Sequence, residues 1–386
     1  MTAESHPCSG QVCEYRTLTD LPQAVRGLFD RAGQASVFLS REWFELLHRH
    51  VYSTTPDLRI LAIGQGNGDG NSCLLLPLRQ EIHRWGPFRF NQLSALANFY
   101  TGLYAPVCED PASCPTTALE ALADHLSKAP EYQILALGPL DPSTATTREL
   151  IESLSRRRWY CHTSRTITNW YHPVRESSFD QYWSQRPARL RNTVRRRWRK
   201  VQREAECRIS VITTPPDLDA ALKDYWQVYE RSWKSEEGYP VCIDGFMRLC
   251  AIKGQLRLGI LYLDGVPAAA QFWIIHNGSA LIYKLAYDPR YKDYSVGSIL
   301  SRHMFQDAID KDRVGLIDFL TGDDAYKRDW MTRSRSLVHV QLLNQRQAIG
   351  RLYALRKKAA RMLAGSQALP PPSVSAAAMH RSWPIS

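Results

Sequence analysis

Ionisable and aromatic side chains gather in residues 318–330, which read DFLTGDDAYKRDW. The segment follows a continuous apolar stretch, residues 314–320, that is typical of a buried strand. Gly322 predicts the turn at the end of that strand. Functional side chains often lie on loops at strand ends, because a rigid sheet positions them. We therefore take this segment as the first candidate for a functional site and call it the 318–330 box.

A glycine upstream of the box, Gly297, opens an amphipathic helix after a polar loop. Without a side chain, the backbone N–H groups of a helix start can approach an anion closely, and the helix dipole favours negative charge there. The ligand that suits such a place is a phosphate or a pyrophosphate. A glycine at a helix start is also an ordinary cap, and the ionisable box that follows favours the functional interpretation.

Three stretches rich in β-branched and aromatic residues precede this helix. They span residues 256–263, 266–276 and 280–287. Asp264-Gly265 and Asn277-Gly278 separate them, and both pairs are strong signals for tight hairpin turns. The sequence therefore predicts an antiparallel meander, then a loop over residues 288–296, the helix and the apolar strand.

Several short motifs in this region resemble a known family. They are Tyr287-Asp288-Pro289, Tyr294-Ser295-Val296-Gly297, Asp318-Phe319, Gly322-Asp323-Asp324-Ala325-Tyr326-Lys327 and Trp330. The region resembles the BioF2-like acetyltransferase domain of the GNAT superfamily. This domain is found in acetyltransferases of cellulose and exopolysaccharide biosynthesis and is related to the FemAB/FemX aminoacyl transferases. The similarity extends more loosely over residues 38–343. It implies an α/β (α+β) fold of tandem GNAT-like modules, each a mixed, mostly antiparallel sheet flanked by helices.

The same resemblance implies a binding turn for acyl-CoA. In GNAT proteins the pyrophosphate lies on a Gln/Arg-x-x-Gly-x-Gly/Ala turn. Here Tyr294 occupies the first position and Ile299 the last, so only Gly297 matches. Acetyl-CoA or another acyl-CoA as cosubstrate, with no metal, is therefore implied by the family and not by the turn itself. The residues that would bind it are Tyr294, Ser295, Val296, Gly297 and Ser298.

Acyl transfer from a thioester to an amine needs a neutral amine, donors for the oxyanion and a proton source for the thiolate. In the box, Asp323 or Asp324 is placed to take the amine proton and Tyr326 to donate to the thiolate. Lys327 is placed to hold a phosphate or carboxylate of the acceptor, since the comparable lysine of Fem-type enzymes faces the substrate channel. The predicted catalytic residues are Asp323, Tyr326 and Lys327. The predicted substrate-binding residues are Asp318, Gly322, Asp324 and Trp330.

Each of these residues also has a structural interpretation. A carboxylate at Asp318, inside an apolar strand, is costly unless it is paired, and a structural arginine partner explains it equally well. Trp330 is more typical of a core aromatic than of a stacking platform. Asp324 is typical of a loop surface. Lys327 is expected to be exposed if it binds the acceptor, whereas Lys327 paired with Asp318 or Asp323 would be a structural bridge.

Length and composition bound the class of protein. With 386 residues and 44% hydrophobic content, the chain is long enough for two domains with cores of their own. No apolar run approaches the roughly 18–20 residues of a membrane span. Residues 1–13 lack the pattern of a secretory signal, which predicts a cytoplasmic location. Nine cysteines without a CxxC pair argue against a disulfide framework and against a zinc site.

The first half of the chain shows an organisation that the second half repeats. Ser40 is placed to cap a helix, and two strands follow it at 58–63 and 73–78, joined by a glycine-rich turn at 64–71. The corresponding helical stripe of the second half is Leu218, Leu222, Tyr225, Tyr229 and Trp233. We predict an extension at 1–35, a first GNAT-like domain at 36–172 and a second at 173–345 that carries the acetyltransferase motifs.

Residues 186–203 hold nine Lys or Arg residues and no acid, in a chain of formal charge +11. Their apolar members fall on one side of a helix: Leu190, Val194, Trp198 and Val201. Like charges repel at i,i+4 by a few tenths of a kcal/mol per pair, so this density favours an anionic partner over a solvated face. The predicted polyanion-binding residues are Arg195, Arg196, Arg199 and Lys200. The candidate ligands are phosphate, nucleic acid and acidic lipid headgroups.

The C-terminal region divides into two parts. Residues 346–364 predict a second basic amphipathic helix, which lies either on an anionic membrane surface or against the first domain. A membrane role would place the protein peripherally at the inner face of the membrane. Residues 365–386 are rich in Pro, Ser and Ala and predict a disordered tail.

Three functions follow from these observations. The first is a cytoplasmic GNAT-type N-acyltransferase that modifies an amine on a sugar, polysaccharide or peptide precursor of the cell envelope. The second is a FemX-like aminoacyl transferase, whose basic helix would hold aminoacyl-tRNA. The third is a non-catalytic protein that binds polyanions.

Overall fold

The computed structural model describes residues 11–53, 57–64, 72–176 and 178–365, and it divides into two compact units. Within the described residues, the first unit comprises residues 11–167 and 336–365, and the second comprises residues 168–335. The predicted tail, most of the glycine-rich turn at 64–71 and residues 1–10 lie outside the described residues. In that part of the chain which is described, no helix is long and apolar enough to cross a membrane.

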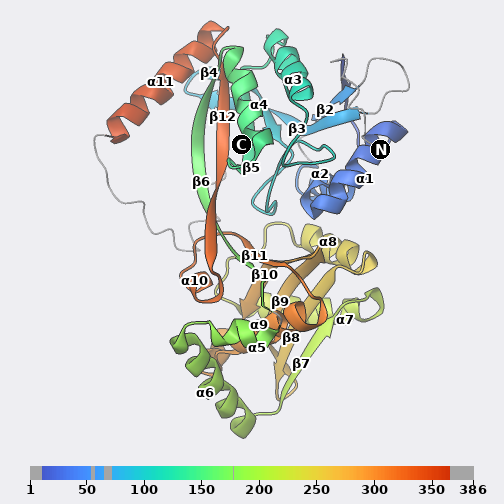
Figure 1. The fold of residues 1–386 in the computed structure, drawn as a ribbon, viewed down its shortest axis with the longest axis vertical. Helices are drawn as coiled ribbons and strands as arrows, with labels where there is room; N and C mark the ends of the chain where they lie inside the picture. Colours follow the sequence, from blue (N-terminus) through green and yellow to red (C-terminus); the bar gives the residue numbers. More distant parts are fainter. Residues whose placement is uncertain (1–10, 54–56, 65–71, 177, 366–386) are drawn as a thin grey trace. The chain divides into compact units, whose positions relative to one another are not determined.

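The first unit alternates helices with the strands of one sheet (Figure 1). Its strands are β1 Gln11–Tyr15, β2 Leu58–Gly64, β3 Ser72–Trp85, β4 Phe88–Ala95, β5 Ile134–Leu140 and the first part of β6 Trp159–Pro173. Its helices are α1 Gln23–Ala35, η1 Val37–Leu39, α2 Arg41–His50, α3 Thr116–Lys128 and α4 Ala145–Arg156, with α11 Ala348–Gly365 at the end of the chain.

Residues 11–35 belong to this unit and are not a separate extension. Strand β1 pairs antiparallel with β2 from Gln11↔Gly64 to Tyr15↔Ile60. Helix α1 buries four apolar side chains: Val25, Leu28, Phe29 and Ala32. The boundary predicted at residue 36 is therefore wrong. The predicted cap of α2 is confirmed, because Ser40 Oγ accepts a hydrogen bond from the backbone N–H of Trp43.

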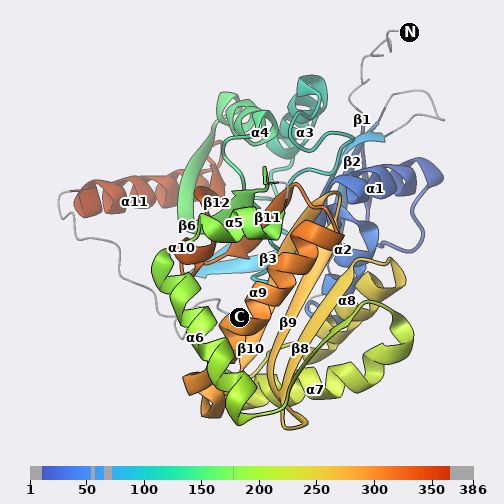
Figure 2. The same ribbon diagram turned by 60° about the horizontal axis from the view of Figure 1, so that its bottom comes forward.

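The second unit contains the predicted meander (Figure 2). Its strands after β6 are β7 Cys207–Ile212, β8 Leu256–Leu263, β9 Val266–His276, β10 Ser279–Tyr287, β11 Leu316–Thr321 and the first part of β12 Arg333–Asn344. Its helices are α5 Phe179–Ser184, α6 Ala188–Glu204, η2 Pro215–Asp217, α7 Leu218–Arg231, α8 Pro240–Ile252, η3 Pro289–Tyr294, α9 Val296–Gln306, the π-helical turn η4 Asp307–Lys311 and α10 Lys327–Trp330.

The two predicted hairpin turns are confirmed. Asp264 and Gly265 have φ angles of 49° and 77°, and Asn277 and Gly278 have φ angles of 44° and 67°. Two consecutive residues with positive φ form the mirror-image turn that matches the twist of an antiparallel hairpin. Asn, Asp and Gly adopt that conformation at low cost, which explains why the boundaries of β8 and β9 could be predicted from the sequence.

The two units repeat one order of elements. Strand, two helices, three strands, helix, strand, helix and strand follow each other from β1 to β6 and again from β7 to β12. Each repeat has one parallel strand pair among antiparallel ones, β4 with β5 and β10 with β11. The tandem fold is therefore confirmed, although the counterpart of α2 is α8 and not α7, and Trp233 lies in the loop after α7.

Each unit is completed by a strand from the other repeat. The end of β6, from Asn169 to Pro173, pairs antiparallel with β11 in the second unit. The end of β12 pairs with β5 in the first unit, from Val338↔Leu140 to Leu343↔Ile134. The domain boundary predicted between residues 172 and 173 is therefore wrong, because the second unit begins at Thr168, inside β6.

Helices cover both faces of the second unit's sheet. Trp273 of β9 packs edge-on against Phe305 of α9, and its neighbour Phe272 packs against Phe246 of α8. Adjacent residues of a strand point to opposite faces, so α9 and α8 lie on opposite sides of β9, as Figure 2 shows for α9. The core on the α9 side includes Leu300, Phe305 and Trp330, all at most 3% exposed.

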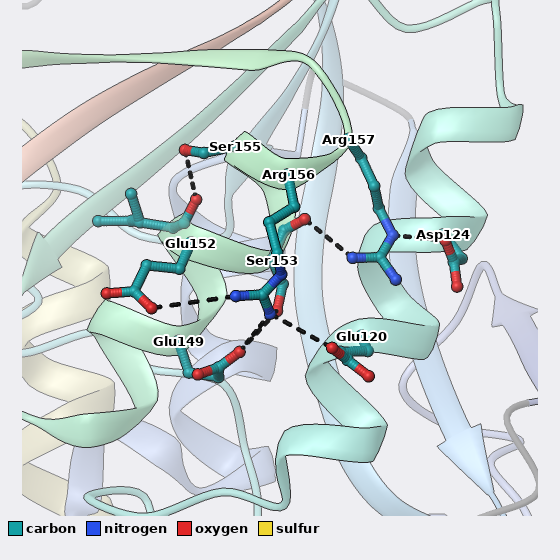
Figure 3. Close-up of polar contacts among 9 residues, drawn as sticks. Glu120, Asp124, Glu149, Glu152, Ser153, Ser155, Arg156 and Arg157 are labelled. Carbon is teal, nitrogen blue, oxygen red and sulfur yellow. Dashed lines mark hydrogen bonds and ion pairs between the residues drawn. The ribbon is translucent and has the colours of Figure 1, made fainter.

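Helices α3 and α4 of the first unit are joined by exposed ion pairs (Figure 3). Arg156 lies among three carboxylates: Glu149 at 2.6 Å, Glu120 at 3.3 Å and Glu152 at 4.0 Å. Arg157 pairs with Asp124 and holds the pKa of that carboxyl below its usual range. Because water screens exposed pairs, they contribute little to stability, and we assign them no functional role.

One cysteine pair differs from the expectation of free thiols. Cys108 and Cys114, six residues apart, form a disulfide in the first unit. An odd, scattered set of nine cysteines did not predict it, because the loop that brings the two together has no sequence signature.

Candidate active site

The start of α9 offers backbone N–H groups without a protein cap. Ser295 precedes the helix in the left-handed conformation, with φ 53°, and among the described residues no side chain caps the helix. The N–H groups of Ser298 and Ile299 both donate to Ser295 O, at 3.0 and 3.1 Å. Those of Val296 and Gly297 come first in the helix and have no acceptor within it. Val296 is completely buried and Gly297 is only partly buried, so of these two N–H groups that of Gly297 is placed to bind an anion.

Gly297 is positioned by groups from two strands. Its carbonyl oxygen accepts a hydrogen bond from Gln271 Nε2 at 3.0 Å. A Cβ at Gly297 would lie 3.4 Å from Cδ1 of Tyr287, the last residue of β10. Trp233, which is 51% exposed, also packs on that tyrosine, with ring centroids 4.4 Å apart. An aromatic pair therefore flanks the helix start.

The predicted acyl-CoA turn is only partly available to a ligand. Val296 is completely buried, backbone included, so it offers no group to a ligand. Tyr294 lies against α6, with Lys200 Nζ 4.7 Å from its ring centroid and its hydroxyl donating to Glu204 Oε2 at 3.4 Å. The turn thus brings α6, the basic helix, next to the start of α9.

Strands β10 and β11 part close to this turn. They pair in parallel over three positions, from Ser279↔Leu316 to Leu281↔Asp318. Beyond Leu281 the described part of β10 has no further pairing with β11, and a bulge lies between Ile282 and Lys284. The register of β11 with β6 also shifts after Asp318. Lys284 and the 318–330 box therefore follow the point of separation, one on each strand.

Lys327 is buried at 5% exposure and binds the loop that precedes it. Its ammonium donates to the carbonyl oxygens of Thr321 at 3.0 Å and Gly322 at 3.3 Å, and it lies 3.3 Å from Asp324 Oδ2. Burial lowers its pKa, and the Asp324 carboxylate opposes that shift. The expectation of an exposed lysine is therefore wrong. The structural bridge exists, but its acid is Asp324.

Asp318 has a protein partner for each carboxylate oxygen. Oδ1 accepts from Asn169 Nδ2 at 2.5 Å and from the N–H of Leu320 at 2.6 Å. Oδ2 lies 3.1 Å from Arg335 Nη2. Burial raises the pKa of Asp318, and Arg335 opposes the shift most strongly. The structural alternative, a buried acid paired with an arginine, fits this geometry better than substrate binding.

The remaining acids of the box differ in their surroundings. Asp323 accepts from Trp170 Nε1 at 2.8 Å and pairs with Arg328 at 3.3 Å. The indole N–H and then the guanidinium hold the pKa of Asp323 below its usual range, which weakens it as a base. Tyr326 is 45% exposed, and burial of its hydroxyl together with Asp324 raises its pKa. Tyr326 thus keeps its proton at neutral pH, as a donor must.

Two predicted substrate-binding residues are structural. Trp330 is 3% exposed and stacks on Phe305 with centroids 4.8 Å apart, so the prediction that it binds substrate is wrong. Its carbonyl oxygen accepts from Tyr182 at 2.7 Å and from Arg186 at 3.1 Å. Gly322 has φ 117°, a conformation that favours glycine, and its N–H donates to Thr168 O at 2.9 Å.

The predicted basic helix is α6. Its apolar side is confirmed, with Leu190, Val194 and Val201 at most 8% exposed. The four predicted polyanion-binding residues border one open hollow of about 630 Å³, together with Asn192, Arg197 and Arg203. They are Arg195, Arg196, Arg199 and Lys200. Arg195 and Arg196 are exposed, whereas Lys200 is half-buried and 3.7 Å from Glu204.

Sequence reasoning missed the loop between α7 and α8, which contains WKSEEGYP. Glu237 of this loop is 7% exposed and pairs with Lys284 of β10. Lys234 and Trp233 belong to the same loop. An aromatic residue and several charges next to a Gly-x-Pro turn were the only signal that could have identified it.

Comparisons with known proteins agree with the fold. Residues 188–328 match the model of the acetyltransferase (GNAT) domain family, so the match begins in α6 and ends in the 318–330 box. The fold is similar to that of FemX, with a TM-score of 0.56 and 11% identity, over 89% of this chain and 100% of FemX. It is also similar to a conserved protein of unknown function from Bacteroides thetaiotaomicron VPI-5482. That comparison has a TM-score of 0.51 and 11% identity, over 84% of this chain and 98% of the other. No curated protein matches the sequence.

Proposed function

We propose that this acyltransferase, which carries a GNAT acetyltransferase domain at residues 188–328, uses acyl-CoA, first of all acetyl-CoA, as its donor. The acceptor that we propose is an amine on a sugar, polysaccharide or peptide precursor of the cell envelope. The observation that carries the proposal is the uncapped start of α9, which lies inside the matched domain after β10. The N–H of Gly297, which has no acceptor within the helix, suits the pyrophosphate of the donor.

Two further features support a nucleotide-bearing donor. Trp233 and Tyr287 form an aromatic pair beside Gly297, which suits contact with a flat or apolar part of the donor. Lys200 lies over Tyr294 in the same turn, where a cation can reach a phosphate. The acyl end of a donor anchored here would lie toward the point where β10 and β11 part.

Tyr326 is the candidate proton donor for the thiolate. Its hydroxyl is protonated at neutral pH, as a tyrosine hydroxyl ordinarily is, and it follows β11, the strand that parts from the one carrying Lys284. The roles predicted for Lys327 and Asp323 remain predictions. The contacts of Lys327 favour a structural contribution, and the lowered pKa of Asp323 makes it a weak proton acceptor.

The donor can be tested by a thermal-shift series with acetyl-CoA, longer acyl-CoAs, free CoA and aminoacyl-tRNA. A ligand at 100 times its dissociation constant stabilises the folded state by about 2.7 kcal/mol. We expect acetyl-CoA and CoA both to raise the melting temperature, and acetyl-CoA but not CoA to support acyl transfer to amino sugars or envelope peptides. Stabilisation by aminoacyl-tRNA alone would contradict the acyl-CoA proposal.

An aminoacyl-tRNA donor is the second candidate, and α6 is the observation that favours it. Exposed arginines border its hollow, and the helix contacts the turn before α9. Positive charge of this density is typical of surfaces that bind nucleic acid backbones. The FemX fold is compatible with this candidate but does not select it.

An anionic membrane surface remains a proposal for α11. Tyr353 and Ala354 pack into the first unit, whereas Leu352, Leu355 and Met362 are 46%, 62% and 77% exposed. The helix also carries basic residues and no acid from position 348 to 365. Apolar side chains flanked by positive charge suit a layer of acidic lipid headgroups. A cytoplasmic location likewise remains a prediction.

A further inference from the structure

Three lysines from different segments meet in the second unit. Lys234 lies on the loop between α7 and α8, Lys284 on β10 and Lys327 at the start of α10. Lys284 pairs with Glu237, and Lys327 pairs with Asp324. Among the described residues, Lys234 has no carboxylate within ion-pair distance of its ammonium group, although it is half-buried. It is therefore the one member of this trio without a counter-ion in the described structure.

The position of Lys234 is defined by the ring of Tyr229. The Nζ atoms of Lys234 and Lys284 lie 5.6 and 5.7 Å from the centroid of that ring. Lys284 follows the bulge at which β10 leaves β11. The adjacent residue Trp233 packs on Tyr287, next to Gly297. Lys234 thus shares the ring of Tyr229 with Lys284, and the residue before it packs beside the start of α9.

These surroundings destabilise the charged form of Lys234. Desolvation lowers its pKa first, and the ammonium groups of Lys284 and then Lys327 lower it further. Glu237 and Asp324 oppose the shift, and the resulting pKa is about 7. A lysine whose pKa is near neutral is a mixture of amine and ammonium, and its amine can accept a proton.

We propose that Lys234 is the general base of the transfer reaction and takes the proton from the acceptor amine. The inference rests on the proposed acyltransferase function. The acceptor nitrogen attacks the thioester carbonyl carbon, a C–N bond forms, and the nitrogen becomes positively charged. Nζ of Lys234 takes the proton from this nitrogen. The C–S bond then breaks with its electron pair on sulfur, and the thiolate takes a proton from Tyr326. Lys234 returns its proton to solvent and Tyr326 regains one, so no oxidation or reduction occurs.

The titration of Lys234 can be measured without turnover. Competitive labelling of the unaltered protein with limiting acetic anhydride, read by mass spectrometry, gives the pH at which each lysine becomes reactive. We expect a midpoint near pH 7 for Lys234, well below the ordinary lysine value of about 10.4. A midpoint above about 9 for Lys234 would overturn the proposal, because its charged form would then be the stable one.

Three variants then separate a base from an anion-binding cation. Lys234→Arg keeps the charge but cannot accept a proton, and Lys234→Met removes both properties. We expect each to lower kcat about 10²–10⁴-fold and to remove the limb of the pH–rate profile near 7. Lys223→Met is the matched control and should change neither. If Lys234→Arg retains activity while Lys234→Met raises KM, Lys234 holds an anionic group of the substrate and the base proposal is wrong.

Folding and function are controlled separately. Lys234→Met removes an unpaired ammonium, so its melting temperature should not fall below that of the unaltered protein. If the unaltered protein transfers no acyl group from any donor in the series, the proposed function fails, whatever the titration of Lys234. If it transfers acyl groups and both Lys234 variants remain active, only the base assignment fails.

Discussion

Replacement of Lys327 by alanine tests whether the 318–330 box is held together by this side chain. The variant removes two charge-assisted hydrogen bonds, to Thr321 O at 3.0 Å and Gly322 O at 3.3 Å. Bonds of this kind contribute about 1.5–3 kcal/mol each, and a buried carbonyl left without a donor adds to the loss. The ion pair with Asp324 adds little, because that carboxylate is 42% exposed and water can replace the lysine.

The loss is reduced because Lys327→Ala also removes a buried cation that is costly to desolvate. We therefore expect a net destabilisation of about 3 kcal/mol, which corresponds to roughly 6–12 °C in melting temperature for a unit of this size. Lys223→Ala, at an exposed position of α7, is the control and should shift the melting temperature by about 1–2 °C at most.

Melting and acyl transfer should be measured on the same preparation. If Lys327 is structural, activity will fall in proportion to the folded fraction and will recover at lower temperature. A melting temperature within about 2 °C of the unaltered protein, with turnover reduced more than about tenfold, would refute this reasoning. That result would restore the catalytic role predicted from the sequence.

Three further perturbations test other parts of the chain. Gly297→Val should abolish CoA binding in calorimetry with little change in fold. Gly297→Ala should retain more affinity, because its single Cβ meets Tyr287 at contact distance. Equal CoA affinities in both variants would show that this turn does not bind the donor. Replacement of the four basic α6 residues by Gln should weaken the salt dependence of polyanion binding. The slope of log binding constant against log salt concentration should become shallower by roughly 0.7–0.9 for each phosphate that the helix no longer neutralises. An unchanged slope would show that this side of the helix is only a solvated face. Burial lowers the pKa of His339 to about 4, so the unfolded state binds the proton more tightly than the folded state does. Stability should therefore fall as the pH drops below about 6.5, and the contribution of His339 is about 2 kcal/mol at pH 5. His339→Gln should remove this contribution in pH-resolved denaturation and leave those of His83, His172 and His303, whose pKa values are also lowered. An unchanged profile would contradict the assignment.

Local signals predicted the meander because they act between neighbouring residues. Asp264-Gly265 and Asn277-Gly278 define the turns, and the boundaries of β8 and β9 follow from them. The cap at Ser40 was predictable for the same reason. The apolar side of α6 follows from helical periodicity alone. In each case the sequence contains both the signal and the partner within a few residues.

Pairings between distant residues could not be predicted in this way. Lys327 was expected to be exposed, because a lysine after a turn usually is, and its burial depends on how the loop after β11 folds back. Trp233 continues the apolar period of α7 but lies outside the helix, where it packs on Tyr287. The low pKa of Lys234 depends on burial and on Lys284 and Lys327, two lysines that are distant from it in sequence.

The exchange of strands between the repeats explains why one repeat alone does not complete the candidate site. Strand β6 ends the first repeat, yet its last residues lie in the second unit, where Asn169 binds Asp318 and Trp170 binds Asp323. The carboxylates of the box are therefore oriented by side chains that precede the matched domain in sequence.

The first unit has the same strand order but not the same helix start. Its counterpart of α9 is α3, which begins after Pro115 and has no glycine in its first turn. The connection from β4 to α3 is longer than that from β10 to α9 and contains the Cys108–Cys114 disulfide. Both repeats thus supply the same order of strands. In the described residues, only the second repeat has a glycine at the uncapped helix start that follows its three-stranded meander. The chemistry should accordingly depend on substitutions at Gly297 and Lys234, and the first repeat contributes through the β6 side chains that hold the box.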